Sequence, residues 1–126
     1  RHPVYSLEKV VSEEELLAAQ EKVKSVFVAP MVKRYIVDLT RQTRQHAEVY
    51  LGASPRGSLA LYRTGQARAA MQGRDYVLPD DIKDLALPIL AHRLILEPEA
   101  LFTGVSVERI VDDLLAEVAA PMERVG

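Results

Sequence analysis

Apolar residues recur every three to four positions along most of this chain, a period that predicts amphipathic helices. The connector at 46–53 breaks the period and has a β-prone centre, so at most one short extended pair is expected. The expected fold class is all-α, a small helical bundle of about five helices. These helices are predicted over residues 12–24, 30–45, 54–72, 79–96 and 106–120.

Signals for helix ends support several of these boundaries. Ser12 and Glu15 have the spacing of a capping box, in which each side chain binds the backbone N–H group of the other residue. Ser106 is placed to cap the start of the last helix. Gly73 follows the third helix at the position where a glycine commonly ends a helix.

Three residues inside the predicted helices are poor helix formers. Gly57 and Gly65 each weaken the third helix by roughly 1 kcal/mol relative to alanine. Their presence predicts that another group packs or binds close to the backbone there. Pro88 is expected to kink the fourth helix, and a loop is expected around Pro98 and Gly104.

Composition narrows the class of protein. The 126 residues are 48% hydrophobic and 27% charged, which is typical of one globular domain. The absence of cysteine excludes a disulfide scaffold, a zinc ribbon and a thiol nucleophile. Uncharged apolar runs reach about eight residues, far short of the ~20 of a membrane-spanning helix, so no membrane association is expected. The start of the sequence has no signal-peptide pattern and no initiating methionine, so a cytoplasmic fragment or processed chain is expected.

The net charge of −2 conceals an uneven distribution. Residues 33–74 contain eight basic and two acidic side chains, giving +6, while the remainder carries −8. Such a segment is suited to a phosphate-bearing ligand, a nucleic acid or an acidic protein, or is simply a solvated helix face. Charge alone leaves these interpretations open.

The sequence lacks the common catalytic motifs GxxxxGK(S/T), GxGxxG, HExxH and GxSxG. Its three histidines are far apart along the chain, so no metal site is predicted. The adjacent acids Asp80-Asp81 and Asp112-Asp113 point in different directions on a helix, and helix capping and solvation explain them. No catalytic residue is therefore predicted, and the chain by itself is not expected to be an enzyme.

The most suggestive segment runs from Gly52 into the third helix. Ser54 has the position of an N-cap and Pro55 that of the first helical residue. Arg56 then lies in the first helical turn, where free backbone N–H groups and a forked guanidinium together make an anion site. Arg63, seven residues later, falls on the same helical face and is a weaker candidate for the same ligand. The chemistry leaves two interpretations open for Arg56, a phosphate contact or a plain surface arginine.

Other prominent side chains are expected to be structural. Met31, Tyr35 and Tyr62 occur at helical spacing and are interpreted as core residues rather than as the lining of a ligand site. Arg44 and Arg93 are interpreted as partners in ion pairs that hold the bundle together.

Several of these segments, taken together, resemble one known domain. The C-terminal lid of MoxR-type AAA+ ATPases is similar to this chain at residues 51–56 (LGASPR), 59–61 (LAL), 73–81 (GRDYVLPDD) and 92–94 (HRL). The predicted helix with Tyr35 and Arg44 and the opening stretch 2–17 also resemble this lid. The segments follow in the expected order and cover nearly the whole chain, so the resemblance is more specific than any single motif.

This resemblance implies domain boundaries and a site. Residues 1–11 would lead in from an αβα ATPase core that the sequence lacks, residues 12–120 would form the helical lid, and residues 121–126 would form a tail. Arg56 would be the sensor-2 arginine, which contacts the γ-phosphate of ATP bound by the core. Ser54, Pro55 and, as a weaker candidate, Arg63 are the other expected cofactor-binding residues. The full-length protein would use ATP and Mg²⁺. Without the core, the chain is expected neither to hydrolyse ATP nor to bind it tightly.

The resemblance also implies a function for the full-length protein. MoxR-type proteins are ring-forming, chaperone-like ATPases that help to mature enzymes containing metals or cofactors, methanol dehydrogenase among them. The implied partners are the αβα core of the same chain, further copies in the ring and a protein with a von Willebrand factor A domain.

Two alternatives rest on the residues alone. One is a small DNA-binding helical module, suggested by the basic middle segment, and the other is a structural adaptor bundle. The basic residues are spread around the helices without interleaved aromatic residues, which counts against binding of nucleic acid.

Overall fold

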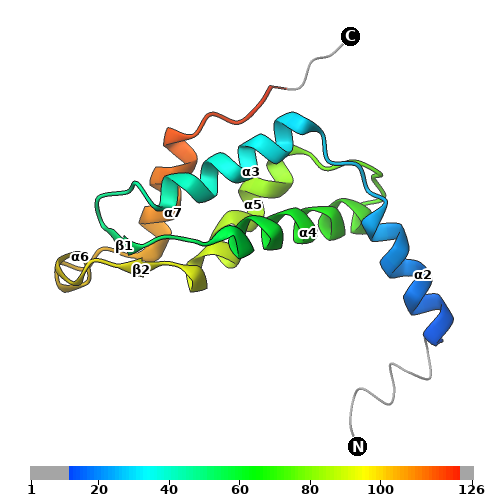
Figure 1. Ribbon diagram of the computed structural model, residues 1–126, viewed down its shortest axis with the longest axis horizontal. Helices are drawn as coiled ribbons and strands as arrows, with labels where there is room; N and C mark the ends of the chain where they lie inside the picture. Colours follow the sequence, from blue (N-terminus) through cyan, green and yellow to red (C-terminus); the bar gives the residue numbers. More distant parts are fainter. Residues whose placement is uncertain (1–11, 123–126) are drawn as a thin grey trace, which may run out of the picture.

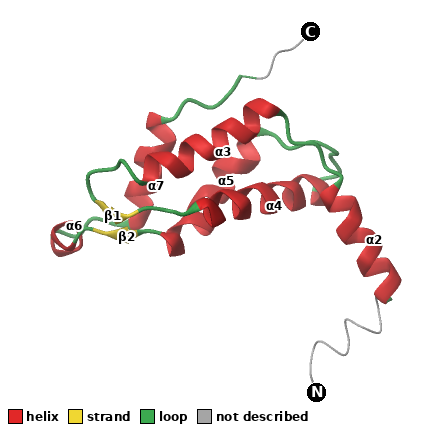
Figure 2. Cartoon of the chain, viewed as in Figure 1, coloured by secondary structure: helices red, strands yellow, loops and turns green. Residues whose placement is uncertain are grey.

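The computed structural model describes residues 12–122, which form a helical body from which one helix projects (Figure 1). The expected lead-in at 1–11 and the end of the expected tail lie outside the described residues. Within 12–122, six α-helices, one short 3-10 helix and one pair of short strands confirm the expected all-α fold with a single extended pair (Figure 2). No helix in this range has both the length and the apolar character needed to span a bilayer. The elements are α2 (Glu13–Lys24), α3 (Pro30–Thr43), β1 (Val49–Leu51), α4 (Pro55–Met71), α5 (Pro79–Leu90), η1 (Ala91–Arg93), β2 (Ile95–Leu96), α6 (Pro98–Phe102) and α7 (Val107–Glu117).

The second half of the chain differs from the prediction in two places. The helix expected over 79–96 continues past Pro88 but ends at Leu90, and after η1 the backbone becomes extended. Strand β2 then pairs antiparallel with β1. The loop expected around Pro98 contains the short helix α6, with Pro98 at its first position. Strand pairing joins distant segments, so periodicity along the chain does not reveal it.

The predicted helix ends are confirmed where side chains form them. Ser12 Oγ accepts the Glu15 N–H group at 3.0 Å and Glu15 Oε1 accepts the Ser12 N–H group at 2.9 Å, which completes the capping box. Ser106 Oγ accepts the Arg109 N–H group at 3.1 Å at the start of α7. Gly73 follows α4 with φ +77°, a left-handed conformation that glycine adopts without steric cost.

The apolar core lies between α3, α4, α5 and α7, which make up the body of the molecule (Figure 1). Tyr35 is a core residue, as expected. Met31 is 48% exposed because its side of α3 faces solvent, so the core interpretation is wrong for this residue. Tyr62 is half-buried. The large side chains that are fully buried include Leu39, Leu61, Ile82, Leu90, Ile110 and Leu114.

Two glycines of α4 allow other side chains to approach its backbone. A Cβ atom at Gly65 would lie 2.9 Å from Cδ1 of the buried Ile82 in α5. A Cβ atom at Gly57 would lie 3.1 Å from the Cβ atom of Ala53 and 3.5 Å from Cδ of Arg93. The close approach that was expected at these glycines is confirmed.

Helix α2 has no buried residue and projects from the body, but the link that follows it is firmly attached (Figure 1). Gln66 of α4, itself buried, donates from Nε2 to Val26 O at 2.9 Å. The Phe27 N–H group donates to Asp75 O, and the Val77 N–H group donates to Phe27 O, both at 2.9 Å. These bonds join the α2–α3 link to α4 and to the α4–α5 turn.

Candidate functional site

The start of α4, which holds the candidate anion site, is anchored to the end of α3. Ala53 is fully buried and immediately precedes the N-cap residue of α4. Its N–H group donates to Thr43 Oγ1 at 2.9 Å, and its carbonyl oxygen accepts from Arg44 Nη1 at 2.7 Å. Because both backbone groups of Ala53 are held by Thr43 and Arg44 at the end of α3, the first turn of α4 has a fixed position in the body.

Gly52 permits this close attachment. A Cβ atom at Gly52 would lie 2.6 Å from Cγ and 2.8 Å from the backbone nitrogen of Arg44. Real Cβ atoms do not make contacts this short, so glycine fits between the end of α3 and the segment that leads to α4.

The backbone N–H groups in the first turn of α4 are already used. Pro55 has no N–H group. The Arg56 N–H group donates to Ser54 Oγ at 3.2 Å, and the Gly57 N–H group donates to Ser54 O at 2.8 Å. The two N–H groups that were expected from the sequence to be free therefore have partners in Ser54, and Pro55 has no N–H group to offer. Among the donors of Arg56, the guanidinium is the group that points to an anion site based on a side chain.

Arg56 supplies an exposed guanidinium at this end of the helix. No carboxylate within residues 12–122 forms an ion pair with it. A guanidinium presents its N–H donors in a planar fork that matches the oxygen atoms of a phosphate. Arg56 is thus available to an anion that comes from outside the described residues.

Two further arginines lie around the first turn of α4. Arg44 binds Ala53 O, and Arg93 Nη1 donates to Ile89 O at 2.7 Å. Across the described part of the chain, no carboxylate lies within ion-pair distance of Arg44 or Arg93. The interpretation of these residues as ion-pair partners is therefore wrong, because each guanidinium binds a backbone carbonyl instead.

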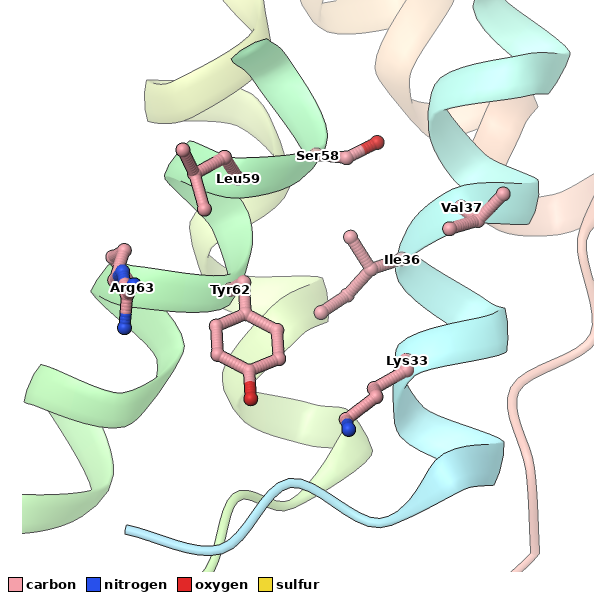
Figure 3. A pocket seen from close by; sticks show the side chains of 7 residues that line it. All are labelled: Lys33, Ile36, Val37, Ser58, Leu59, Tyr62 and Arg63. Carbon is pink, nitrogen blue, oxygen red and sulfur yellow. The ribbon is translucent and has the colours of Figure 1, made fainter. Parts of the chain in front are cut away.

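A groove of about 470 Å³ lies between α3 and α4, further along α4 (Figure 3). Tyr62 projects into the space between the two helices, with Lys33 Nζ 6.0 Å and Arg63 Cζ 5.7 Å from the centroid of its ring. At these distances both cations are attracted to the aromatic ring. The other lining residues are Ile36, Val37, Ser58 and Leu59.

Arg63 therefore has different neighbours from Arg56. Besides Tyr62, it contacts Gln66, whose Oε1 accepts from Arg63 Nη1 at 3.4 Å. The seven-residue spacing separates the two arginines by about 10 Å along the helix axis. The structure places Arg63 at the groove and Arg56 at the end of α4, so each has its own surroundings.

Asp81 is a buried ionised residue that the sequence did not reveal. Arg74 donates to both of its carboxylate oxygens, and the Leu78 N–H group donates to Oδ2 at 2.7 Å and so caps α5. The expected helix-capping role of Asp81 is confirmed. The expectation that its side chain is solvated is wrong, because the exposed fraction of Asp81 is 2%. Burial raises the pKa of Asp81, whereas the bonds from Arg74 and Leu78 and the charge of Arg68 lower it, and the pKa is lowered overall.

A second polar cluster joins the α3–β1 connector to α7. His46 Nε2 lies 3.0 Å from Asp113 Oδ2, and His46 Nδ1 accepts the Glu48 N–H group at 3.0 Å. Because Nδ1 accepts, the proton of the neutral imidazole is assigned to Nε2, which donates to Asp113. Asp113 is thus half-buried and paired, which corrects its expected solvation.

His46, Glu48 and Asp113 have the composition of a metal site, but their potential ligand atoms are already engaged in other interactions. One ligand atom from each of His46, Glu48 and Asp113 lies within 4.8 Å of the others. Both imidazole nitrogens already have hydrogen-bond partners, and Arg109 Nη2 lies 3.7 Å from Glu48 Oε1, where it supplies a positive charge. The geometry fits a structural link, and the absence of a metal site stays a prediction.

Comparison with known proteins identifies relatives along most of the chain. A family model described as the AAA lid domain matches residues 41–114. The uncharacterized protein YeaC of Bacillus subtilis (strain 168) is 45% identical over 123 residues, which cover 98% of this chain and 38% of that protein. Chaperone MoxR1 of Mycobacterium tuberculosis is 33% identical over 122 residues, which cover 90% of this chain and 32% of that protein. The chain thus spans about a third of the length of these curated relatives.

A solved structure agrees with the fold as well as with the sequence. The crystal structure of a protein from Cytophaga hutchinsonii ATCC 33406, provisionally assigned as an ATPase, superposes with a TM-score of 0.77 at 33% identity and covers 81% of this chain and 34% of that chain. The family model covers more than half of the chain and includes the anchored start of α4. This chain therefore belongs to the AAA lid domain family, as the lid of a MoxR-family AAA+ ATPase.

Proposed function

We propose that this lid senses the nucleotide bound by the αβα core of the full-length protein, with Arg56 as the sensor-2 arginine on the γ-phosphate of ATP. The observation that supports this role is the exposed guanidinium of Arg56 at an anchored helix end, without a carboxylate partner in the described chain. Ser54 accepts the N–H groups of Arg56 and Gly57, and Pro55 has no N–H group, so the Arg56 guanidinium is the group proposed to bind the phosphate.

The same arrangement couples hydrolysis to movement of the lid. ATP, held with Mg²⁺ by the core, supplies the phosphate whose loss changes the charge opposite Arg56. A guanidinium donates two parallel hydrogen bonds to a phosphate, and this attraction weakens when the γ-phosphate leaves. Because Ala53 ties the first turn of α4 to α3, the helical body follows any displacement of Arg56.

For the full-length protein, we infer a cytoplasmic, ring-forming ATPase with chaperone-like activity. Its proposed role is the maturation of enzymes that contain metals or cofactors, such as methanol dehydrogenase, together with a partner that carries a von Willebrand factor A domain. The name of the relative Chaperone MoxR1 supports the chaperone class. The lid itself has no catalytic site among its described residues, so turnover belongs to the longer protein.

The decisive experiment replaces Arg56 in the full-length protein. In Arg56→Ala, ATP turnover should fall at least about tenfold, which corresponds to about 1.4 kcal/mol of barrier. Arg56→Lys keeps the charge but loses the fork, so its rate should be intermediate. Arg34→Ala removes another exposed arginine, from α3, and should leave turnover unchanged as the matched control. Undiminished turnover in Arg56→Ala would overturn the sensor role.

A further inference from the structure

Arg93 crosses the first turn of α4 in the space that Gly57 leaves open. Its Cδ atom lies 3.5 Å from the position that a Cβ atom on Gly57 would occupy. Gly57 is the residue after Arg56, and consecutive Cα atoms are about 3.8 Å apart. The aliphatic part of Arg93 therefore runs beside Gly57, the residue that directly follows the proposed sensor Arg56, although Arg93 comes from η1 rather than from α4.

The contacts that Arg93 makes with residues 12–122 leave most of its donors unused. Nη1 donates to Ile89 O at 2.7 Å, in an exposed hydrogen bond to a carbonyl four residues earlier. Among residues 12–122, the Arg93 guanidinium forms no ion pair. A guanidinium carries five N–H donors, so the greater part of its binding capacity remains available.

Positive charge accumulates at this end of α4 without compensation. Arg44, Arg56 and Arg93 lie around its first turn, and no carboxylate of the described residues pairs with any of them. Further along the same helix the situation differs, because Arg68 Nη2 lies 2.8 Å from Asp84 Oδ2. Like charges gathered on one surface create a potential that attracts an anion.

Arg44 and Arg93 differ in how firmly they are held. Arg44 Nη1 binds Ala53 O in a partly buried hydrogen bond that anchors α4. The Arg93 bond to Ile89 O is exposed, so water can replace the guanidinium as the donor at little cost. Arg93 is therefore the arginine that is free to turn toward a ligand beside Arg56.

We propose that Arg93 is a second phosphate-binding residue, which joins Arg56 on the polyphosphate of a nucleoside triphosphate. The inference rests on the proposed function, because it requires a nucleotide at Arg56. Two guanidinium groups that approach from different elements, η1 and α4, bind a phosphate chain more firmly than one group does. They also fix the direction of that chain relative to the lid.

The test uses the full-length protein with Arg93→Gln, Arg56→Ala and, as the matched control, His92→Ala from the same exposed turn. Arg93→Gln retains an aliphatic stem against Gly57 and an amide that can donate to Ile89 O, but it removes the charge. Dissociation constants are measured for a non-hydrolysable ATP analogue, for tripolyphosphate and for AMP, alongside the melting temperature.

Arg93→Gln should bind the ATP analogue and tripolyphosphate about tenfold more weakly, because a charged hydrogen-bond donor to the phosphates is lost. Its affinity for AMP and its melting temperature should match those of His92→Ala. If Arg56→Ala weakens the binding of both polyphosphate ligands and Arg93→Gln does not, the role of Arg93 alone is overturned. If neither variant changes binding, the role of Arg93 and the proposed function fall together. If Arg93→Gln lowers the melting temperature and weakens AMP binding equally, Arg93 is structural and the proposal is again overturned.

Discussion

The guanidinium of Arg74 holds both carboxylate oxygens of Asp81, with Nη1 2.8 Å from Oδ2 and Nη2 2.7 Å from Oδ1. Arg74 belongs to the turn after α4, and Asp81 lies in the first turn of α5. The pair therefore fixes the angle at which the chain passes from one core helix to the next. Its two hydrogen bonds are parallel and charge-assisted, which is the strongest geometry available to an arginine and a carboxylate.

Asp81→Asn should destabilise the domain strongly. The variant leaves the largely buried Arg74 without its counter-charge, and breaking a buried ion pair from one side costs about 3–5 kcal/mol. The measurement is the free energy of unfolding from urea denaturation of the 126-residue chain. Asp80→Asn is the matched control, since Asp80 is exposed and lies 3.8 Å from Lys83, and it should cost less than about 1 kcal/mol. Equal losses in the two variants would contradict this account.

Acid should weaken the domain through the same carboxylate. Burial raises the pKa of Asp81, but the bonds from Arg74 and Leu78 and the charge of Arg68 lower it more, so the folded pKa lies below the ordinary value. The stability contributed by ionised Asp81 is complete above its unfolded pKa of about 3.9 and is lost as the pH falls through the lower folded pKa. The free energy of unfolding, measured by urea denaturation at a series of pH values, should therefore decline below about pH 4.

The control for this acid dependence is the same series on Asp81→Asn. Its decline should be shallower, because one carboxyl with a lowered pKa has been removed. Some decline remains, since hydrogen bonds from the backbone and side chain of Ser12 lower the pKa of Glu15 in both proteins. Identical acid slopes would show that Asp81 does not carry the effect.

Thr43→Val should loosen the start of α4. The substitution keeps the shape of the side chain but removes the oxygen that accepts the Ala53 N–H group at 2.9 Å. A buried donor left without a partner costs about 1–3 kcal/mol. The loss is measured as the free energy of unfolding, together with the hydrogen-exchange rate of the Ala53 amide. Thr43→Ser keeps the oxygen and should retain slow exchange, and equal exchange in both variants would contradict the role of Thr43.

Gly52→Ala should destabilise the domain, whereas Gly57→Ala should be tolerated far better. A Cβ atom on Gly52 meets the backbone nitrogen of Arg44 at 2.8 Å, and overpacking of this kind costs about 1–3 kcal/mol. At Gly57 the nearest contact is 3.1 Å, and alanine gains about 1 kcal/mol of helix propensity there. Thermal unfolding of both variants measures their relative stability. A lower melting temperature for Gly57→Ala than for Gly52→Ala would refute the prediction.

Zinc should leave the stability of the chain unchanged. His46 already uses both ring nitrogens, with Asp113 and with the Glu48 N–H group, and Arg109 adds a positive charge beside the cluster. Binding of a metal ion would require these bonds to break first. The melting temperature is followed during a Zn²⁺ titration. A rise that disappears in His46→Ala would show that the cluster is a metal site after all.

Local signals were sufficient for the helix starts. Ser12, Ser54 and Ser106 each cap a helix through an N–H group two or three residues away, so the neighbouring sequence contains all the information needed. The end of α5 at Leu90 depends on a distant contact, because β2 exists through its pairing with β1. Two α-helices and the 3-10 helix η1 separate these strands in the sequence. Such a pairing leaves no trace in the period of apolar residues.

In the candidate site, too, features that depend on neighbouring residues could be predicted, and features that depend on distant contacts could not. Arg56 stood out because its cap and its helical position are contiguous in the sequence. The attachment of Ala53 to Thr43 and the approach of Arg93 to Gly57 join residues from separate elements, so they became visible only in the folded chain. The burial of Asp81 and its pairing with Arg74 could not be predicted for the same reason. The sequence shows that an acidic residue lies at the start of a helix, but not which residues cover it.

The attachment of the α2–α3 link has a mechanical consequence. The bonds from Gln66 to Val26 and from Val77 to Phe27 hold the base of α2 to the body, while its 12 residues extend outward for about 18 Å. A helix held in this way acts as a lever arm. A rotation of the body by about 10° displaces the far end of the arm by about 3 Å. A small rotation of the body that begins at Arg56, in the first turn of α4, would therefore move the far end of α2 by a distance comparable to the size of a side chain.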